Sequence, residues 1–261
     1  MRTTVYIDGF NLYYAIRNYN CKWLNVKALA EKVLSTPYLV NKIKYYTARV
    51  SGAADSDQPR RQHIYFKALQ TVPGVELYFG KFLAKTVWRP LMNLPAADRA
   101  IDLAGTYVQF PAGEYEIQAD SSHANSRDEV LTIGSYTSGN NNGGSRTVPA
   151  PNNDSIKANV HWMEEKGSDV NLACHLVNDA WAGRFDAAAV ISNDTDLAEP
   201  IRIVTQELNK SVVLLCPSRF GASQHLQNVA SSVRHIHYNH LKTSQFPDPI
   251  PGTTIHKPAS W

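Results

Sequence analysis

The sequence predicts an α/β fold, with a central parallel β-sheet flanked by helices, and two observations support this fold class. Short β-rich stretches alternate with stretches of helical periodicity, which is typical of βαβ units. Two of the β-rich stretches, 185–192 and 212–216, are apolar almost throughout, as expected for strands buried on both faces of a parallel sheet. Hydrophobic residues make up 43% of the 261 residues, which is enough for a substantial core and excludes disorder throughout the chain.

Three strands and three helices are predicted before a long interruption of this pattern. Leu12, Ile16 and Tyr19 recur at helical spacing after the first strand. The dipeptide Pro73-Gly74 separates the third helix from the strand that follows it. The predicted strands are 3–7, 42–50 and 75–83, and the predicted helices are 12–19, 26–33 and 60–70.

Residues 85–159 are predicted to be a long, partly disordered insertion, because the interval is far longer than an ordinary loop. Segments 106–110 and 114–117 are expected to form a β-hairpin within it. Residues 121–159, which include the low-complexity stretch SYTSGNNNGGS, are expected to be mostly mobile.

The regular pattern resumes at Ser168 with a helix that Gly183 ends. Pro200 falls in the first turn of the next predicted helix, where proline is tolerated. The later predicted strands are 185–192, 212–216 and 233–237, and the later helices are 197–208 and 223–233. We therefore predict one domain over residues 1–240, interrupted at about 85–159, and a proline-rich C-terminal arm over 241–261.

The overall charge is nearly balanced, with 26 Lys and Arg against 23 Asp and Glu. This excludes a polycation, so any surface for nucleic acid must be a local patch. Three cysteines without a CxxC spacing predict buried, inert thiols in a reducing compartment. The start lacks the apolar region of a signal peptide, and no stretch is long and apolar enough to span a membrane. We therefore expect a cytoplasmic protein without a membrane partner.

Acidic residues follow two of the predicted strands. Asp8 follows strand 3–7, and Asp194 and Asp196 follow strand 185–192. Ligands of open parallel sheets bind outside the carboxyl ends of the strands, so these carboxylates are expected to converge on one crevice. Converging carboxylates repel one another unless protons or a cation compensate them, and hard oxygen ligands favour Mg²⁺ or Mn²⁺.

Each of these acids also has a structural alternative. Asp8-Gly9 is ordinary turn chemistry, and Asp194 with Asp196 would suit the start of the following helix. Asp169, at another predicted helix start, would complement the helix dipole. Asn11 either reaches the same crevice or caps the first helix, and Glu165 is either a further acid or part of a solvated charge run.

Three sequence blocks resemble the NYN domain family, PIN-like nucleases that include LabA-like bacterial proteins. They are VYIDGFNL at 5–12, EKGSDVNL at 165–172 and ISNDTDL at 191–197, and the resemblance covers about 3–83 and 160–237. It implies a PIN-like α/β fold and a metal-dependent ribonuclease. The implied metal ligands are Asp8, Asp169, Asp194 and Asp196, with Asn11 as a polar companion in the catalytic site. Asn193 departs from the family, which often has glycine there.

The leading hypothesis is therefore an endoribonuclease in which Mg²⁺ or Mn²⁺ activates water and polarises the phosphodiester. A PIN-like protein that binds RNA or acts as a scaffold without turnover is one alternative. A phosphatase of the haloacid dehalogenase type is another, although the first strand lacks the D-x-D pair of that chemistry. Neither a Walker A motif nor GxGxxG occurs, so nucleoside triphosphates and dinucleotides are not expected as cofactors.

RNA is the predicted partner, and homodimerisation is left open. Lys81, Lys85 and Arg89 are interleaved with aromatic residues and are predicted to contact the RNA backbone. The alternative is that the aromatic residues fill the core and the cations only solvate it. Four histidines gather near the C-terminus, where a surface role is favoured over a metal site: His225, His235, His237 and His240.

Overall fold

The computed structural model describes residues 1–52, 55–90, 100–101, 107–108, 116–117, 157–217 and 221–260, and between 84 and 164 it describes the backbone alone. The chain forms two compact units. The first contains residues 1–82 and 165–261, and the second contains residues 83–164. The acidic residues singled out from the sequence all lie in the first unit.

The first unit is built on a six-stranded sheet in the order β11-β10-β9-β1-β2-β3, and each neighbouring pair is parallel. The predicted α/β class with a central parallel sheet is therefore confirmed, and the architecture is compatible with a PIN-like fold. Strand order reverses between β1 and β9, which places the topological switch point there. The strands are β1 (Arg2–Asp8), β2 (Leu39–Thr47), β3 (Val75–Phe79), β9 (Ala187–Ile191), β10 (Ser211–Cys216) and β11 (Ser232–His235).

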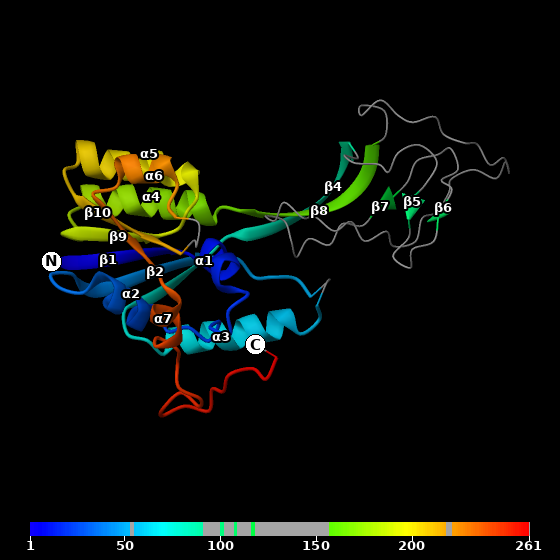
Figure 1. Cartoon of the computed structure of the whole chain (residues 1–261), viewed down its shortest axis with the longest axis horizontal. Helices are drawn as coiled ribbons and strands as arrows, with labels where there is room; N and C mark the ends of the chain where they lie inside the picture. The colour runs from blue at the N-terminus through cyan, green and yellow to red at the C-terminus, as the bar shows by residue number, and fades with distance from the viewer. Residues whose placement is uncertain are drawn as a thin grey trace. The chain divides into compact units, whose positions relative to one another are not determined.

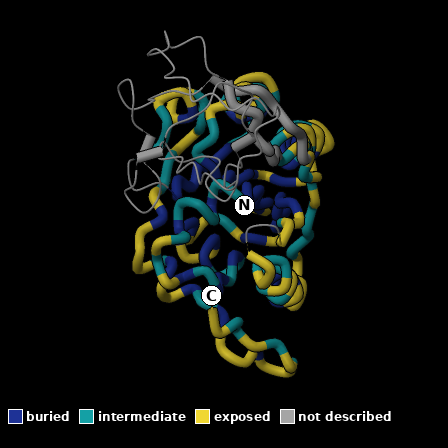
Figure 2. The backbone as a smooth tube through the Cα atoms, turned by 90° about the vertical axis from the view of Figure 1, so that its right-hand side faces the viewer, coloured by how far each residue is buried: buried dark blue, intermediate teal, exposed yellow. Residues whose placement is uncertain are grey.

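Helices cover both faces of this sheet (Figure 1). One face packs against α1 (Gly9–Ile16), α2 (Val26–Leu34), α3 (Gln58–Gln70) and α7 (Tyr238–Lys242). The other face packs against α4 (Ser168–Trp181), α5 (Ala198–Arg202) and α6 (Gln224–Val229). The π-helical segment η3 (Ile203–Glu207) continues directly from α5. Alternating residues of the strands enter two separate cores, and the buried strands lie inside the exposed outer surfaces of the helices (Figure 2).

The expected strand 75–83 is in fact two strands, β3 and β4 (Lys81–Pro90), separated at Gly80. A Cβ atom at Gly80 would lie 2.0 Å from Glu165 Oε1 and 2.7 Å from the carbonyl oxygen of Lys166. The backbone of Gly80 therefore approaches the end of β8 (Lys157–Lys166) more closely than a side chain would allow. Propensity alone could not detect this break, because its cause is a contact distant in sequence.

The second unit contains a sheet in the order β4-β8-β7 and a pair formed by β5 and β6. Its short strands are β5 (Ala100–Ile101), β6 (Tyr107–Val108) and β7 (Glu116–Ile117). The expected hairpin between 106–110 and 114–117 is wrong, because β6 pairs with β5 and β7 pairs with β8. Mobility was expected for residues 121–159, and of these residues 121–156 lie outside the described part of the chain.

The C-terminal segment is tied to the first unit rather than extended away from it. Phe246 and Ile250 are buried, and the backbone N–H of Phe246 donates to the carbonyl oxygen of Trp23. Cys21 is buried as expected, whereas Cys174 is exposed on α4. Among the described residues, no helix has the length and apolar character needed to cross a membrane.

Candidate active site

Asp8 lies at the carboxyl end of β1, at the switch point. Its Oδ1 accepts from the backbone N–H of Asn11 at 2.9 Å and thereby caps α1. Its Oδ2 accepts from the Ser192 hydroxyl at 3.0 Å, just beyond the end of β9. The side chain is almost fully enclosed, since the residue is 4% exposed. Asp8 therefore joins the ends of the two central strands.

The pKa of Asp8 is raised to about 7, and the main cause is burial of its carboxyl group. The negative charges of Asp169 and Asp194 raise the pKa further. The hydrogen bonds from Asn11 and Ser192 favour the ionised form and offset part of the increase. This buried carboxyl group near other carboxylates therefore retains its proton to a higher pH than an ordinary aspartate.

Asp194 belongs to the turn that follows β9 and is linked to Asp8 through Ser192. The Ser192 hydroxyl accepts from the backbone N–H of Asp194 at 3.0 Å. Asp194 Oδ1 in turn accepts from the backbone N–H of Asp196 at 3.0 Å and caps η2 (Thr195–Leu197). The capping alternative considered for Asp194 is thus realised, while its charge still acts on Asp8.

Asn11 and Asn193 hold the neighbouring loops together. Asn11 Oδ1 accepts from the backbone N–H of Asn193 at 3.0 Å. Asn193 Oδ1 accepts from the backbone N–H of Ser223 at 2.8 Å and so fixes the segment that leads into α6. The sequence pattern indicates Asn193 only as a substitute for glycine and does not predict this role. The presence of asparagine in place of glycine was a signal for this role, because a side-chain amide can make hydrogen bonds that glycine cannot.

Asp169 enters the cluster from the first turn of α4. Burial is the main cause that raises its pKa to about 6, followed by the charges of Asp194, Glu165 and Asp196. It is partly exposed, unlike Asp8. Glu165 fixes the start of the same helix, since its carboxylate accepts from the Ser168 backbone N–H at 3.1 Å and from the Ser168 hydroxyl at 2.7 Å. Glu165 therefore caps α4 and keeps Asp169 near the other acids.

The structure describes the side chain of only one of the three residues predicted to contact RNA. Lys81 is exposed at the start of β4. The side chains of Lys85 and Arg89 lie outside the described residues. Two of the four C-terminal histidines are used locally, because the backbone N–H of His237 donates to His240 Nδ1 at 3.2 Å. RNA binding therefore remains a prediction.

The start of α1 also tests the fit of a dinucleotide at the switch point. In dinucleotide-binding sheets the pyrophosphate lies on the helix N-terminus that follows the first strand. Here the Asp8 carboxylate already occupies that position, and a Cβ atom at Gly9 would lie 2.6 Å from the carbonyl oxygen of Tyr46. An anionic pyrophosphate would meet the Asp8 carboxylate, which caps this helix start, so the residues there do not fit the group.

Comparisons with known proteins give one curated relative. No protein-family model matches the chain. The 6-hydroxy-3-succinoylpyridine 3-monooxygenase of Pseudomonas putida (strain DSM 28022 / S16) is 27% identical, over 100% of this chain and 75% of that protein. The crystal structure of a protein of unknown function from Vibrio parahaemolyticus RIMD 2210633 aligns with a TM-score of 0.45 and 13% identity, covering 91% of this chain and 94% of that one.

The prediction of a metal-dependent endoribonuclease is wrong, because the curated relative is named as a monooxygenase, which is an oxidoreductase and not a hydrolase. The same finding contradicts the phosphatase and the scaffold without turnover. Mg²⁺ or Mn²⁺ as cofactor is also wrong. In the described part of the chain, no group of three or more His, Cys, Asp or Glu residues is arranged to hold a metal ion. Asp8 Oδ1 and Asp194 Oδ1 each accept a hydrogen bond from a nearby backbone N–H group.

Proposed function

We propose that this protein is an oxygenase that acts on a hydroxylated aromatic heterocycle, with Asp169 as the group that accepts the proton of the ring hydroxyl. The observation that carries the proposal is the match to a monooxygenase over the full length of the chain. That match includes both strand ends that form the acidic cluster. The name of the relative specifies a hydroxypyridine as its substrate.

The acidic cluster has the chemistry that such a substrate requires. Loss of the hydroxyl proton increases the electron density of the ring and prepares it for attack by an electrophilic oxygen species. A general base works best when its pKa lies near the working pH. Asp169 meets this condition with a pKa of about 6, and it is the more accessible of the two raised carboxyl groups. Asp8 is enclosed by its hydrogen bonds and acts by holding α1 and β9 in place.

A monooxygenase reaction places one oxygen atom of O₂ in the substrate and releases the other as water, consuming two electrons and two protons. A reduced flavin or nicotinamide supplies such electrons when bound. The start of α1 does not fit the pyrophosphate of FAD or of a nicotinamide dinucleotide, because the Asp8 carboxylate caps it. The residues of this chain bind the substrate and remove its hydroxyl proton.

The test measures substrate ionisation separately from turnover. Hydroxypyridines change their ultraviolet spectrum on deprotonation, so titration of the protein with 6-hydroxy-3-succinoylpyridine should produce the spectrum of the bound anion. Asp169→Asn should bind the neutral form and lower kcat/KM by about 100-fold or more, the usual contribution of a general base. Incorporation of labelled oxygen from ¹⁸O₂ into the product identifies the reaction as oxygenation.

Asp57→Asn is the matched control, because Asp57 is an exposed acid at the start of α3, outside the cluster. This variant should retain both the anion spectrum and the turnover rate. An absence of ¹⁸O-labelled product from a panel of hydroxypyridines, with reduced nicotinamide and flavin present, would contradict the proposed activity. An unchanged spectrum and rate in folded Asp169→Asn would contradict the role of Asp169.

Membership of the NYN family, an RNA partner and a homodimer remain proposals beside this one. The three sequence blocks of the NYN resemblance support the first. A cytoplasmic location is proposed as well, and it is supported by the exposed thiol of Cys174, which a reducing compartment would keep in that form.

A further inference from the structure

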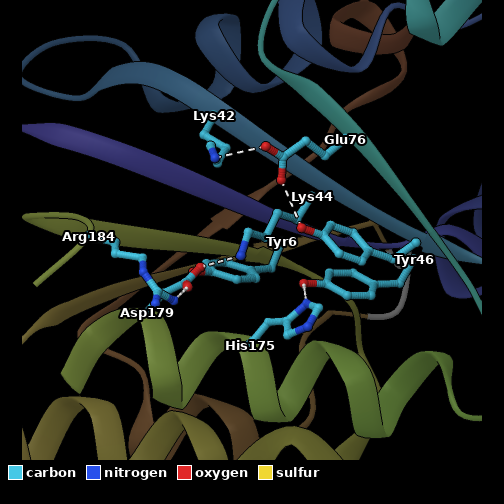
Figure 3. A network of polar contacts seen from close by, with 9 residues as sticks. Tyr6, Lys42, Lys44, Tyr46, Glu76, His175, Asp179 and Arg184 are labelled. Carbon is cyan, nitrogen blue, oxygen red and sulfur yellow. Dashed lines mark hydrogen bonds and ion pairs between the residues drawn. The ribbon is translucent and has the colours of Figure 1, made fainter. Parts of the chain in front are cut away.

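Three tyrosines from adjacent strands, Tyr6, Tyr46 and Tyr78, lie on the sheet face covered by α4. Figure 3 shows Tyr6 and Tyr46 among their polar partners. The hydroxyl group of each tyrosine forms a hydrogen bond with a titratable side chain. The Tyr6 hydroxyl donates to Asp179 Oδ2 at 2.6 Å, and the Tyr78 hydroxyl donates to Glu76 Oε2 at 2.8 Å. The Tyr46 hydroxyl lies 2.9 Å from His175 Nδ1.

The register of the sheet brings two of these rings into contact. Tyr46 of β2 pairs with Tyr78 of β3, and their rings stack with centroids 5.1 Å apart and an interplanar angle of 17°. The His175 ring stands edge-on to Tyr78 at a centroid distance of 4.6 Å. Tyr46 is fully buried, whereas Tyr78 and His175 are partly exposed. The stack therefore runs from the core to the surface.

The direction of the hydrogen bond between Tyr46 and His175 depends on the tautomer of the imidazole. When the ring proton is on Nε2, the phenol donates and Nδ1 accepts at 2.9 Å. Partial burial lowers the pKa of His175, Lys44 and Arg184 lower it further, and Asp179 and Glu76 act in the opposite sense. The lowered pKa favours the neutral imidazole, and in the tautomer with the proton on Nε2 the Nδ1 lone pair faces the phenol proton.

The other two tyrosines have poorer proton acceptors. Asp179 already accepts from Lys44 at 2.6 Å and from Arg184 at 2.5 Å, and these hydrogen bonds lower its pKa. The pKa of Glu76 is lowered by its partners Lys42 and Tyr78. A neutral imidazole is a stronger base than a carboxylate held by cations, because histidine has the higher ordinary pKa.

We propose that Tyr46 and His175 form a redox-active pair that is oxidised by one electron through the stacked ring of Tyr78. One electron leaves the pair for an oxygen-centred radical, which is reduced to its anion, and the proton moves from the Tyr46 hydroxyl to His175 Nδ1. The products on the protein are a neutral tyrosyl radical and an imidazolium ion. An external thiolate restores Tyr46 by returning one electron through Tyr78 and becomes a thiyl radical, and the proton moves back from His175.

If the protein is an oxygenase as proposed, the position of the pair would allow it to protect the site from oxidation. Asp8 and Tyr46 are register partners in β1 and β2, so the backbone of Tyr46 lies next to that of Asp8 in the acidic cluster. Strong oxidants that escape from an oxygenase reaction attack nearby side chains. A tyrosine with a proton acceptor and a stacked neighbour at the surface would carry the oxidising equivalent away from the site.

The experiment generates the oxidant with light and requires neither substrate nor turnover. The protein is irradiated with ruthenium tris-bipyridine and a cobalt(III) electron acceptor, frozen, and examined by EPR spectroscopy. We expect a neutral tyrosyl radical in the unmodified protein and loss of most of that signal in Tyr46→Phe. Tyr45→Phe is the matched control, because Tyr45 is the adjacent buried tyrosine in β2 on the opposite face, and it should keep the signal.

The hydrogen bond is tested in the unmodified protein as well, so the proposal does not depend on the folding of a variant. ENDOR spectroscopy of the radical should detect one exchangeable proton and one nitrogen coupling from the imidazole. A radical without that nitrogen coupling, or an undiminished signal in Tyr46→Phe, would overturn the proposal. Failure of the hydroxypyridine assay would leave this result unchanged, so the two proposals can fail separately.

Discussion

Asp8 and Asp179 are both almost inaccessible to solvent, with exposures of 4% and 2%, and yet their pKa values shift in opposite directions. Burial raises the pKa in both cases. In Asp179 the hydrogen bonds that Lys44, Tyr6 and Arg184 donate to the carboxylate lower the pKa by more than burial raises it. Asp8 receives two neutral hydrogen bonds and faces two further acids. Partners, rather than burial, therefore separate a carboxylate that stabilises the fold from one suited to proton transfer.

The largest effect is expected where a charge would lose its partner. Asp179→Asn leaves the ammonium group of Lys44 buried without its counterion, and breaking such a pair costs about 3–5 kcal/mol. Urea unfolding, followed by far-ultraviolet circular dichroism, measures this loss. The exposed Asp57→Asn should change the free energy of unfolding by no more than about 0.5 kcal/mol. A loss in Asp179→Asn no larger than in this control would show that Asp179 is not the counterion of Lys44.

The opposite result is expected at Asp8. Its pKa rises from 3.8 to about 7 in the folded protein, so protonation favours the fold. That contribution is fully present below about pH 4 and is lost as the pH rises through about 7. Asp8→Asn cannot ionise, so relative to the unmodified protein it should gain stability on the order of a few kcal/mol between about pH 5 and pH 8. Unfolding midpoints at the two pH values measure the gain, and parallel pH profiles of the two proteins would contradict it.

The contrast between these two aspartates also shows what the sequence could predict. Asp8 and Asp194 follow apolar strands, and the rule for the carboxyl ends of parallel strands placed them together correctly. The chemistry could not be predicted in the same way. Whether clustered acids bind a cation or share protons depends on where each oxygen points. The sequence does not show that Asp8 Oδ1 and Asp194 Oδ1 accept from backbone N–H groups while Asp8 Oδ2 accepts from the Ser192 hydroxyl.

Asp179 was not singled out from the sequence, because nothing in its local pattern distinguishes it from other helical acids. Its partners Tyr6 and Lys44 are distant in sequence and belong to two different strands. They meet Asp179 only because β1 and β2 are adjacent under α4. A signal was present in β2, where Lys44 lies between Ile43 and Tyr45 in a stretch that is buried from Ile43 to Thr47. A buried lysine requires an acidic partner, although the sequence does not say which one.

A smaller effect is expected at Gly80, where the chain passes close to the start of α4. Gly80→Ala would bring a methyl group within 2.0 Å of Glu165 Oε1 and 2.7 Å of the Lys166 carbonyl oxygen. Overpacking of this kind costs about 1–3 kcal/mol, and displacement of Glu165 would also weaken the cap of α4. Gly52→Ala is the control, because its nearest contact would be 3.5 Å. Equal melting temperatures for the two variants would show that the backbone adjusts freely at Gly80.

The smallest effect concerns the amide of Asn193, which joins the turn after β9 to the segment before α6. Asn193→Ala removes the acceptor of the Ser223 backbone N–H and should cost about 1 kcal/mol, the typical net contribution of one hydrogen bond. Asn178→Ala on the exposed face of α4 should cost nothing measurable. Hydrogen exchange localises the effect, because faster exchange is expected at Ser223 and not in the central strands. An unchanged exchange rate at Ser223 would show that other contacts hold this segment. The hydrogen bond between Ser192 and Asp8 would then be the contact that positions the acidic cluster.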